Sequence, residues 1–515
     1  MKKIPPGRLL AGLGVLSSLL YEGMTLLSHQ FNWGEGYAER PILAYLLVYF
    51  SLFALYASAA WLVSGRKLDD RRTFIVLVAF GLLFRALLFP AHQIQEDDIY
   101  RYLWDGKVFA HSVNPYAYAP AEVQQYQEFK IAEPERFQAT YDAKEQQELE
   151  RLHRLKWENR QALTILDRVN HPDVPTIYPP LAQFVFASVA KIKADSIGAM
   201  RLAFLIFDLI TLGFIVLLLK TMGKNRNLCL IYFWSPLVIK ETFNSTHLDI
   251  IGIALLTSSI YFLVGRRHVL ASAFLGLSVL GKLYPVILMP LYLQQAVHAS
   301  PAATRGQIAR RLLTLVLVFT AVVILGYLPF ASTGLKTFEG LKTFSIYWQS
   351  NDSLFTLLEY FFGGILGVGA EGQTFLSQSL PTVAAKVTVL CVLVVSLAWF
   401  LLRPRAGGDT TEGIRPLFVM MALVFVLSPV QNPWYLCWLV PFLCVFPERA
   451  WILLTGLVGL YYLDFYFDYQ DIAALSAWTS WLEYTPFYLL LAWDIGRKWR
   501  TRRLAERDAP SAPPA

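Results

Sequence analysis

The sequence has 515 residues, of which 55% are hydrophobic and only 16% are charged, and its mean hydropathy is +0.43. A soluble protein of this length needs more surface charge, so the composition excludes a soluble globular protein and predicts a polytopic membrane protein. The net charge of +7 is concentrated at the ends of apolar segments, which indicates membrane topology and not nucleic-acid binding.

Apolar segments that are long enough, or nearly long enough, to cross a membrane run through most of the chain. We expect one integral-membrane domain over residues 1–515, an all-α bundle of about 12–14 transmembrane helices. Residues 1–72 would add N-terminal spans, the first of them uncleaved, and residues 497–515 would form a cytoplasmic tail. The candidate spans are 9–27, 42–63, 74–90, 200–219, 228–243, 248–264, 269–280, 285–297, 312–330, 382–402, 417–430, 434–446, 451–463 and 481–493.

Basic residues predict the orientation, because cytoplasmic loops are enriched in Lys and Arg. "MKKIPPGR", "GRKLDDRR", "KTMGKNR" and "RKWRTRR" should lie inside. Residues 91–175 then form a long loop on the outer face, periplasmic or luminal, and residues 331–381 form a second outer loop. The apolar helix near residues 181–190 must be a half-span or interfacial helix, because a crossing there would invert the segments that follow.

The first outer loop opens with "EDDIYRYLWDG", residues 96–106, in which three carboxylates are consecutive. Apolar residues recur there at helical spacing, which predicts an amphipathic helix lying on the membrane. A second polar helix is expected through "DAKEQQELERLHRLKWENRQAL". Asp97 or Asp98 can cap the first helix, and capping alone would explain one Asp. Three carboxylates exceed that need, and a partly desolvated carboxylate near a cation can serve as a general base for a hydroxyl acceptor.

Two basic residues are candidates for binding an anionic phosphate. Lys282, in "LGKLYPVILMP", lies between two short apolar helices, where its charge either reaches the interface or meets an anion. Arg101 lies one helical turn beyond Asp97 and Asp98. It either pairs with them or with another acid of the helix in a salt bridge, or binds a ligand phosphate.

Further polar and aromatic residues are expected on the same outer face. His247 and Asp249, in "NSTHLDII", open a helix, where capping also favours Asp. Aromatic and proline motifs, which commonly form interfacial belts and helix breaks, can also line a sugar site. The candidate sugar or acceptor residues are His171, Tyr178, His247, Asp249, Asn351 and Trp434. His171 with Asp173 supplies too few ligands for zinc, and we predict no metal site.

The order of the motifs "NPY", "YPPLAQ", "FDL", "FWSPLVIKETFNSTHLD" and "GKLYPVILMP" resembles that of the integral-membrane C-fold (GT-C) glycosyltransferases. The chain is similar to bacterial polyprenyl-phosphate-mannose-dependent mannosyltransferases and to the catalytic subunit of glycosylphosphatidylinositol mannosyltransferase I. The similarity runs from about residue 74 to residue 290, and it continues more faintly through "NDSLF" and "SPVQNPWYLCWLVP".

The resemblance implies a GT-C bundle that transfers one sugar, mannose, with inversion from polyprenyl phosphate to a lipid or glycan hydroxyl. It implies no cofactor and no metal, no nucleic-acid partner, and a bacterial inner membrane with the active site facing the periplasm. Asp97 matches the catalytic base, with Asp98 as the alternative, because adjacent acids stand where eukaryotic relatives have D-x-D. Lys282 matches the lysine of K-x-x-P, and Lys282 with Arg101 would stabilise the leaving phosphate. Tyr178 matches the tyrosine of Y-x-P.

Three other functions compete with this hypothesis. A lipid-linked sugar transporter or flippase would also have many spans and intramembrane charges. A lipid-linked glycan polymerase or ligase would use a similar donor that carries an oligosaccharide. A non-catalytic scaffold subunit is the third alternative. The long outer loop and the gathering of polar motifs on one face favour the glycosyltransferase.

Overall fold

The computed structural model describes residues 6–34, 36–65, 68–299, 302–367, 374–375, 378–403 and 410–507. Parts of the predicted first span's basic head, of "GRKLDDRR", of the second outer loop and of the cytoplasmic tail lie outside these ranges. Within them the chain is almost entirely helical, which confirms the predicted all-α membrane fold. The strands described, β1 (Thr374–Phe375) and β2 (Gln378–Ser379), form a two-residue antiparallel hairpin.

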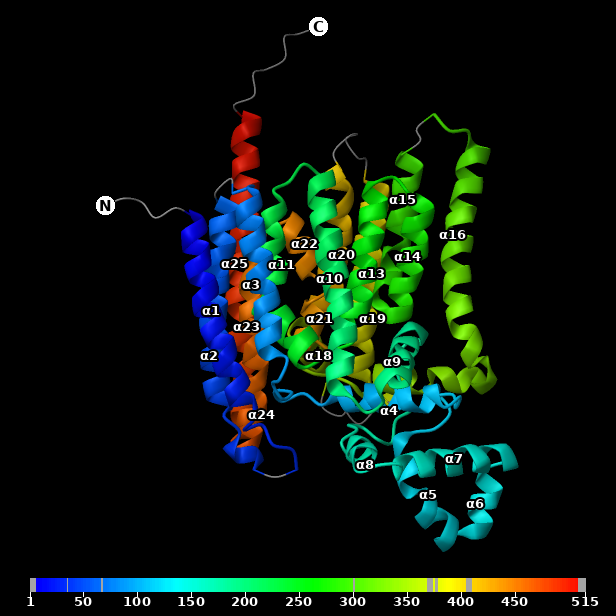
Figure 1. The fold of residues 1–515 in the computed structure, drawn as a ribbon. Helices are drawn as coiled ribbons and strands as arrows, with labels where there is room; N and C mark the ends of the chain where they lie inside the picture. Colours follow the sequence, from blue (N-terminus) through cyan, green and yellow to red (C-terminus); the bar gives the residue numbers. More distant parts are fainter. Residues whose placement is uncertain are drawn as a thin grey trace.

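Long helices run side by side and form the bundle (Figure 1). They are α1 (Pro6–Ser28), α2 (Ile42–Gly65), α3 (Arg71–Leu88), α10 (Ile197–Thr221), α13 (Asp249–Val264), α14 (His268–Gly281), α16 (Arg305–Tyr327), α19 (Leu380–Leu402), α20 (Thr410–Leu427) and α25 (Ser476–Arg507). Each overlaps a predicted span. Among the described residues, six helical stretches are long and apolar enough to cross a membrane. Six is fewer than the predicted number, because this criterion leaves out short and broken apolar elements.

The broken elements correct several predicted spans. Residues 228–243 form η2 (Arg226–Cys229), α11 (Leu230–Phe233), α12 (Pro236–Val238) and the π-helical turn η3 (Ile239–Asn244) instead of one helix. Similar breaks give η4 (Tyr284–Leu288), α15 (Met289–His298), α21 (Pro433–Leu436), α22 (Val440–Val445), α23 (Arg449–Leu457), η7 (Val458–Tyr461) and α24 (Tyr462–Tyr469). Pro236 and Pro433 are the first residues of new helices, and Pro441 is the second residue of another, because proline lacks the amide hydrogen that a continuing helix needs. Such breaks are tolerated where protein covers the backbone, and residues 229–254 are almost wholly buried.

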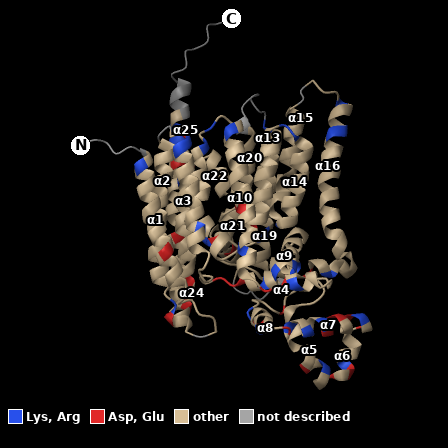
Figure 2. Cartoon of the chain, viewed as in Figure 1, with Lys and Arg blue, Asp and Glu red and all other residues tan. Residues whose placement is uncertain are grey.

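Short helices gather at one end of the bundle, and the start of α1 and the end of α25 lie at the other end (Figure 1). We call the end that carries α4 (Asp98–Ala110), α5 (Pro120–Ala132), α6 (Pro134–Thr140), α7 (Ala143–Lys156) and α8 (Arg160–Asp167) the loop face. The remaining short elements are η1 (Tyr37–Glu39), η5 (Leu328–Phe338), α17 (Glu339–Tyr347), α18 (Leu354–Leu366) and η8 (Ala473–Leu475). Figure 2 shows that the helix ends opposite the loop face carry mainly Lys and Arg, whereas α4 to α8 carry charges of both signs.

The predicted amphipathic helix is α4, but it does not lie exposed on a membrane surface. Residues 99–108 are all buried, because α4 packs against α8 and against α9 (Pro180–Lys193), the helix predicted as a half-span. Tyr102 stacks on Phe186 at 4.8 Å between ring centroids. A Cβ atom at Gly106 would lie 2.6 Å from the Phe186 backbone, so only glycine permits this close approach. The packing holds the first turn of α4 in a defined place.

The second predicted polar helix is divided. It forms α7 and α8, and Asn159 begins the second helix because its side-chain oxygen accepts a hydrogen bond from the Ala162 amide at 2.8 Å. An N-cap of this kind starts a helix and does not occur inside one.

A buried ion pair joins α3 to α10 within the bundle. The Arg85 guanidinium binds Asp208 and donates to the carbonyl oxygens of Gly81 and Phe233, each at 2.9 Å. Asp208 also accepts a hydrogen bond from the Tyr232 hydroxyl at 2.6 Å. The two charged side chains are only 1% and 3% exposed, so neither charge can be solvated by water.

Replacing Asp208 by leucine is expected to lower the free energy of unfolding by about 3–5 kcal/mol, because it leaves the Arg85 charge buried and unpaired. Thermal unfolding in detergent would measure the loss. The double variant Arg85→Met/Asp208→Leu removes both charges and should recover most of the stability. Equal unfolding temperatures for the wild type and the single variant would contradict this role of the pair.

Candidate functional site

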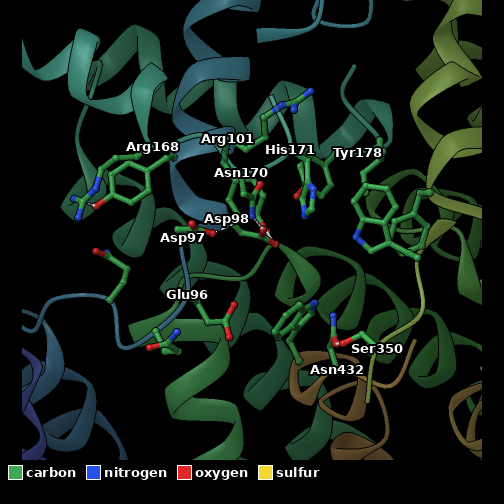
Figure 3. Close-up of a pocket in the computed structure, with 18 of the residues that line it drawn as sticks. Glu96, Asp97, Asp98, Arg101, Arg168, Asn170, His171, Tyr178, Ser350 and Asn432 are labelled. Atoms are coloured by element: carbon green, nitrogen blue, oxygen red, sulfur yellow. Dashed lines mark hydrogen bonds between the residues drawn. The ribbon is translucent and has the colours of Figure 1, made fainter. Parts of the chain in front are cut away.

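A cavity of about 760 Å³ lies at the loop face, where α4 begins. Segments that are far apart in the sequence line it (Figure 3). Its walls come from Ile197 and from residues within 31–40, 92–102, 168–179, 282–284, 341–350, 432–435 and 461–469. The predicted residues Asp97, Asp98, Arg101, His171, Tyr178, Lys282 and Trp434 all contribute to the lining.

Asp97 and Asp98 lie together in the cavity wall and share one hydrogen-bond donor. The Asn170 side-chain amide donates to Asp97 Oδ1 at 2.9 Å and to Asp98 Oδ1 at 2.7 Å (Figure 3). Asp97 precedes the first turn of α4, yet its carboxylate makes no capping hydrogen bond. Helix capping therefore does not explain Asp97, and its carboxylate is directed to the cavity side.

The two carboxyl groups differ in their affinity for a proton. Burial, followed by the neighbouring charge of Asp98, raises the pKa of Asp97 to about 6. Burial acts in the same direction on Asp98, but the nearby His247 ring and the Asn170 amide outweigh it and lower the pKa of Asp98 to about 2. The Tyr102 hydroxyl also donates to Asp98 at 3.2 Å. Asp98 is therefore a fixed anion, and Asp97 is the stronger proton acceptor.

His247 lies behind the acidic pair instead of in the cavity wall. Its Nδ1 is 3.6 Å from Asp98 Oδ2, and its Nε2 is 3.5 Å from Glu241 Oε2. The ring stacks on Trp434 at 4.0 Å between centroids. Glu241 in turn accepts a hydrogen bond from the Tyr462 hydroxyl at 2.9 Å. His247 thus places a ring nitrogen beside Asp98 without lining the cavity itself. Trp434, on which it stacks, presents an aromatic surface to the cavity.

Lys282 lies at the break between α14 and η4, as predicted, and lines the cavity instead of extending to the surface. Its ammonium group is 2.8 Å from Asp249 Oδ1 and donates to Oδ2 at 2.9 Å. It also lies 4.0 Å from the centre of the Tyr435 ring. Asp249 accepts a further hydrogen bond from Trp438 at 2.6 Å. Asp249 is therefore the buried partner that orients Lys282.

Arg101 forms the intrahelical salt bridge, and its partner is Asp105. Its Nε donates to Asp105 at 2.9 Å, and a terminal nitrogen donates to the Val174 carbonyl at 3.0 Å. It makes no ion pair with Asp97 or Asp98 among the described residues, which corrects the pairing considered from the sequence.

The remaining sugar or acceptor candidates differ in position. The His171 ring meets Trp348 edge to face at 4.6 Å, and Tyr178 packs edge to face on Tyr102 at 5.0 Å. Asn351 lies outside the cavity lining, because its amide donates to Glu483 at 3.1 Å. Its role in sugar or acceptor binding stays a prediction.

Sequence reasoning missed several residues of the cavity. Asn170, which joins the two aspartates, and the guanidinium groups of Arg40 and Arg168 line it. Glu96, the first acid of the predicted triplet, lines it too: its Oε1 is buried without a hydrogen-bond partner, and burial raises its pKa to about 7. The motif "NHPD" next to His171 was the signal that could have identified Asn170.

Metal-ligating residues do not cluster in this structure. In the part of the chain that is described, no group of three or more His, Cys, Asp and Glu side chains is placed to hold a metal ion.

Residues 176–429 match the family model of glycosyltransferase family 87. The match covers just under half of the chain and includes Tyr178, His247, Asp249 and Lys282, but it ends before Trp434 and begins after Asp97 and Asp98. Comparisons with curated proteins and with solved structures found no match. The family match, together with the helical bundle, supports a multi-pass membrane glycosyltransferase.

Proposed function

We propose that this membrane glycosyltransferase moves a single mannose from polyprenyl phosphate to a hydroxyl group of a lipid or glycan, with inversion at the anomeric carbon. The observation that carries the proposal is the pairing, in one cavity, of a carboxylate with raised proton affinity and a half-buried lysine. A base for the acceptor and a cation for the leaving phosphate are the two groups that such a transfer needs.

The loop face is proposed to be the outer face of the membrane. The Lys and Arg side chains at the opposite helix ends support this orientation, because cytoplasmic segments are enriched in these residues (Figure 2). The cavity would then open to the periplasm of a bacterial inner membrane, where a lipid-linked donor is available and a nucleotide sugar is not required.

The chemistry follows from the positions of the side chains. Asp97 takes the proton of the acceptor hydroxyl while that oxygen forms a bond to the anomeric carbon. The bond from this carbon to the phosphate oxygen breaks, and its electron pair leaves with polyprenyl phosphate. Lys282 stabilises the charge that develops on the phosphate, and Arg101, whose charge Asp105 partly offsets, is the second proposed cation. The reaction balances without a cofactor or a metal ion.

Other residues would position the reactants. Asp98, held by Tyr102 and Asn170, keeps its charge beside the sugar and raises the basicity of Asp97. The aromatic surfaces of His171, Tyr178 and Trp434 are proposed to stack on the apolar faces of the sugars.

The proposal is tested by offering synthetic polyprenyl phosphate sugars, with mannose, glucose, galactose or arabinose as the head group, to the purified protein in nanodiscs. We expect release of polyprenyl phosphate from the mannose donor only, and an α-linked product from a β-linked donor. Movement of an intact donor across the bilayer without release would instead indicate a transporter. Consumption of no donor with any acceptor lipid would overturn the proposed function.

A further inference from the structure

The cavity contains two guanidinium groups that form no direct ion pair with a carboxylate of the described residues. Arg40 donates to the Gln95 side-chain oxygen at 3.0 Å and to the Asn32 carbonyl at 3.1 Å, and its guanidinium lies 4.2 Å from the centre of the Tyr37 ring. Arg168 binds the Tyr100 hydroxyl and lies over that ring at 4.6 Å. Neither has a carboxylate oxygen within 4.0 Å among the described residues.

The other cations of the cavity are compensated. Lys282 is paired with Asp249, and Arg101 is paired with Asp105. Arg40 and Arg168 are each half-buried and are held only by neutral acceptors and aromatic rings. A partly buried charge without a counter-charge is costly unless a ligand supplies one. These two residues are therefore the cations of the cavity that have no carboxylate in direct contact among the described residues.

The acidic pair separates this charge from the Lys282 side. Asp97 interacts electrostatically with both Arg40 and Arg168, whereas Asp98 interacts with Lys282 and His247. Figure 3 shows Arg168 and Tyr178 on opposite sides of the two aspartates. An inverting transfer requires the acceptor oxygen and the leaving phosphate on opposite faces of the anomeric carbon. If the leaving phosphate lies at Lys282, the acceptor hydroxyl must approach the anomeric carbon from the opposite side. That side is the one next to Asp97, Arg40 and Arg168.

We propose that Arg40 and Arg168 form a subsite for an oxyanion carried by the acceptor, a phosphate or a carboxylate group. The inference rests on the proposed function and adds the chemical class of the acceptor. The planar guanidinium matches a phosphate or carboxylate through paired hydrogen bonds. The Trp33 ring, 43% exposed and 5.0 Å from the Arg168 guanidinium, offers an adjoining surface to the acceptor. Because Trp33 and Arg40 lie between α1 and α2, acceptor recognition involves the N-terminal helices, outside the family match.

Binding of a soluble anionic lipid tests the subsite without any sugar transfer. The probe is dihexanoylphosphatidylglycerol, titrated by microscale thermophoresis into the full-length protein in a neutral detergent, with uncharged dihexanoylglycerol for comparison. Arg40→Gln and Arg168→Gln should each weaken binding of the anionic probe about tenfold, through loss of a charge-assisted hydrogen bond. Arg136→Gln, on the exposed surface of α6, is the matched control and should bind as the wild type does.

The variants also separate this subsite from the donor site. Lys282→Gln should leave the affinity for the anionic probe nearly unchanged; loss of binding in this variant alone would overturn the proposal. Wild-type affinity in both arginine variants would overturn it as well. If Arg40→Gln fails to fold, the affinities of Arg168→Gln and of the charge-preserving Arg40→Lys for the anionic probe still test the subsite. Arg40→Lys should retain part of the wild-type affinity.

Kinetics identify the source of the oxyanion. Initial rates of polyprenyl phosphate release are compared for two acceptors that have the same sugar, with and without a phosphate group. Arg168→Gln should raise KM for the phosphorylated acceptor about tenfold and leave KM for the donor unchanged. A rise in donor KM instead would show that the arginines bind the donor phosphate, against the proposal. Failure of the proposed function is distinct, because no donor would then be consumed while the probe-binding differences remained.

Discussion

Asp97→Asn is expected to lower kcat by roughly 10²–10⁴-fold, the contribution of a general base. Asparagine has the shape of aspartate and can accept the Asn170 hydrogen bond through its side-chain oxygen, so the cavity should keep its structure. What it loses is the ability to take the acceptor proton. Donor binding, measured separately, should be little changed, and the thermal unfolding temperature should match that of the wild type.

The pH dependence of the same reaction tests the assignment independently. Because the pKa of Asp97 is about 6 and the base must be deprotonated, kcat/KM should fall as the pH drops below about 6. The charge of Asp98 raises that pKa, so Asp98→Asn should move the acidic limb to lower pH while retaining more turnover than Asp97→Asn. Turnover lost in Asp98→Asn but retained in Asp97→Asn would exchange the two roles.

The structural features that could be predicted are those set by residues close together in the sequence. The helical spacing of apolar residues after Asp98 predicts α4, and the charged residue between two apolar runs predicts the break at Lys282. Apolar length predicts the bundle. Breaks such as those at Pro236 and Pro433 are visible as prolines, but whether a buried segment bends there depends on the protein packed around it.

The partners in the cavity depend on contacts between distant segments and could not be predicted. Asn170 and Asp97 are 73 positions apart, and Tyr462 and Glu241 are 221 apart. Arg40 and Arg168 belong to no recognisable sequence motif. They line one cavity because the loop between α1 and α2 lies beside residues 92–102 in the fold. The hydrogen bond from Asn351 to Glu483, 132 positions away, could not be predicted for the same reason.

Lys282→Gln is expected to lower kcat by roughly 10²–10³-fold, because one preorganised group that stabilises developing charge is removed. The same change leaves Asp249 buried without its counter-charge, since the pair is joined at 2.8 Å and Asp249 is 1% exposed. Lost activity alone would therefore not separate a chemical role from a structural one. Both kcat and the thermal unfolding temperature must be measured on each variant.

The double variant Lys282→Gln/Asp249→Asn distinguishes the two roles of the lysine. It removes both charges while preserving side-chain size, so stability should return toward that of the wild type. If Lys282 stabilises the leaving phosphate, turnover stays low in the double variant, and Lys282→Arg restores part of it because the positive charge returns. If the double variant regains activity with its stability, Lys282 acts only as the counter-charge of the buried Asp249. The cation that stabilises the phosphate must then be another residue of the cavity.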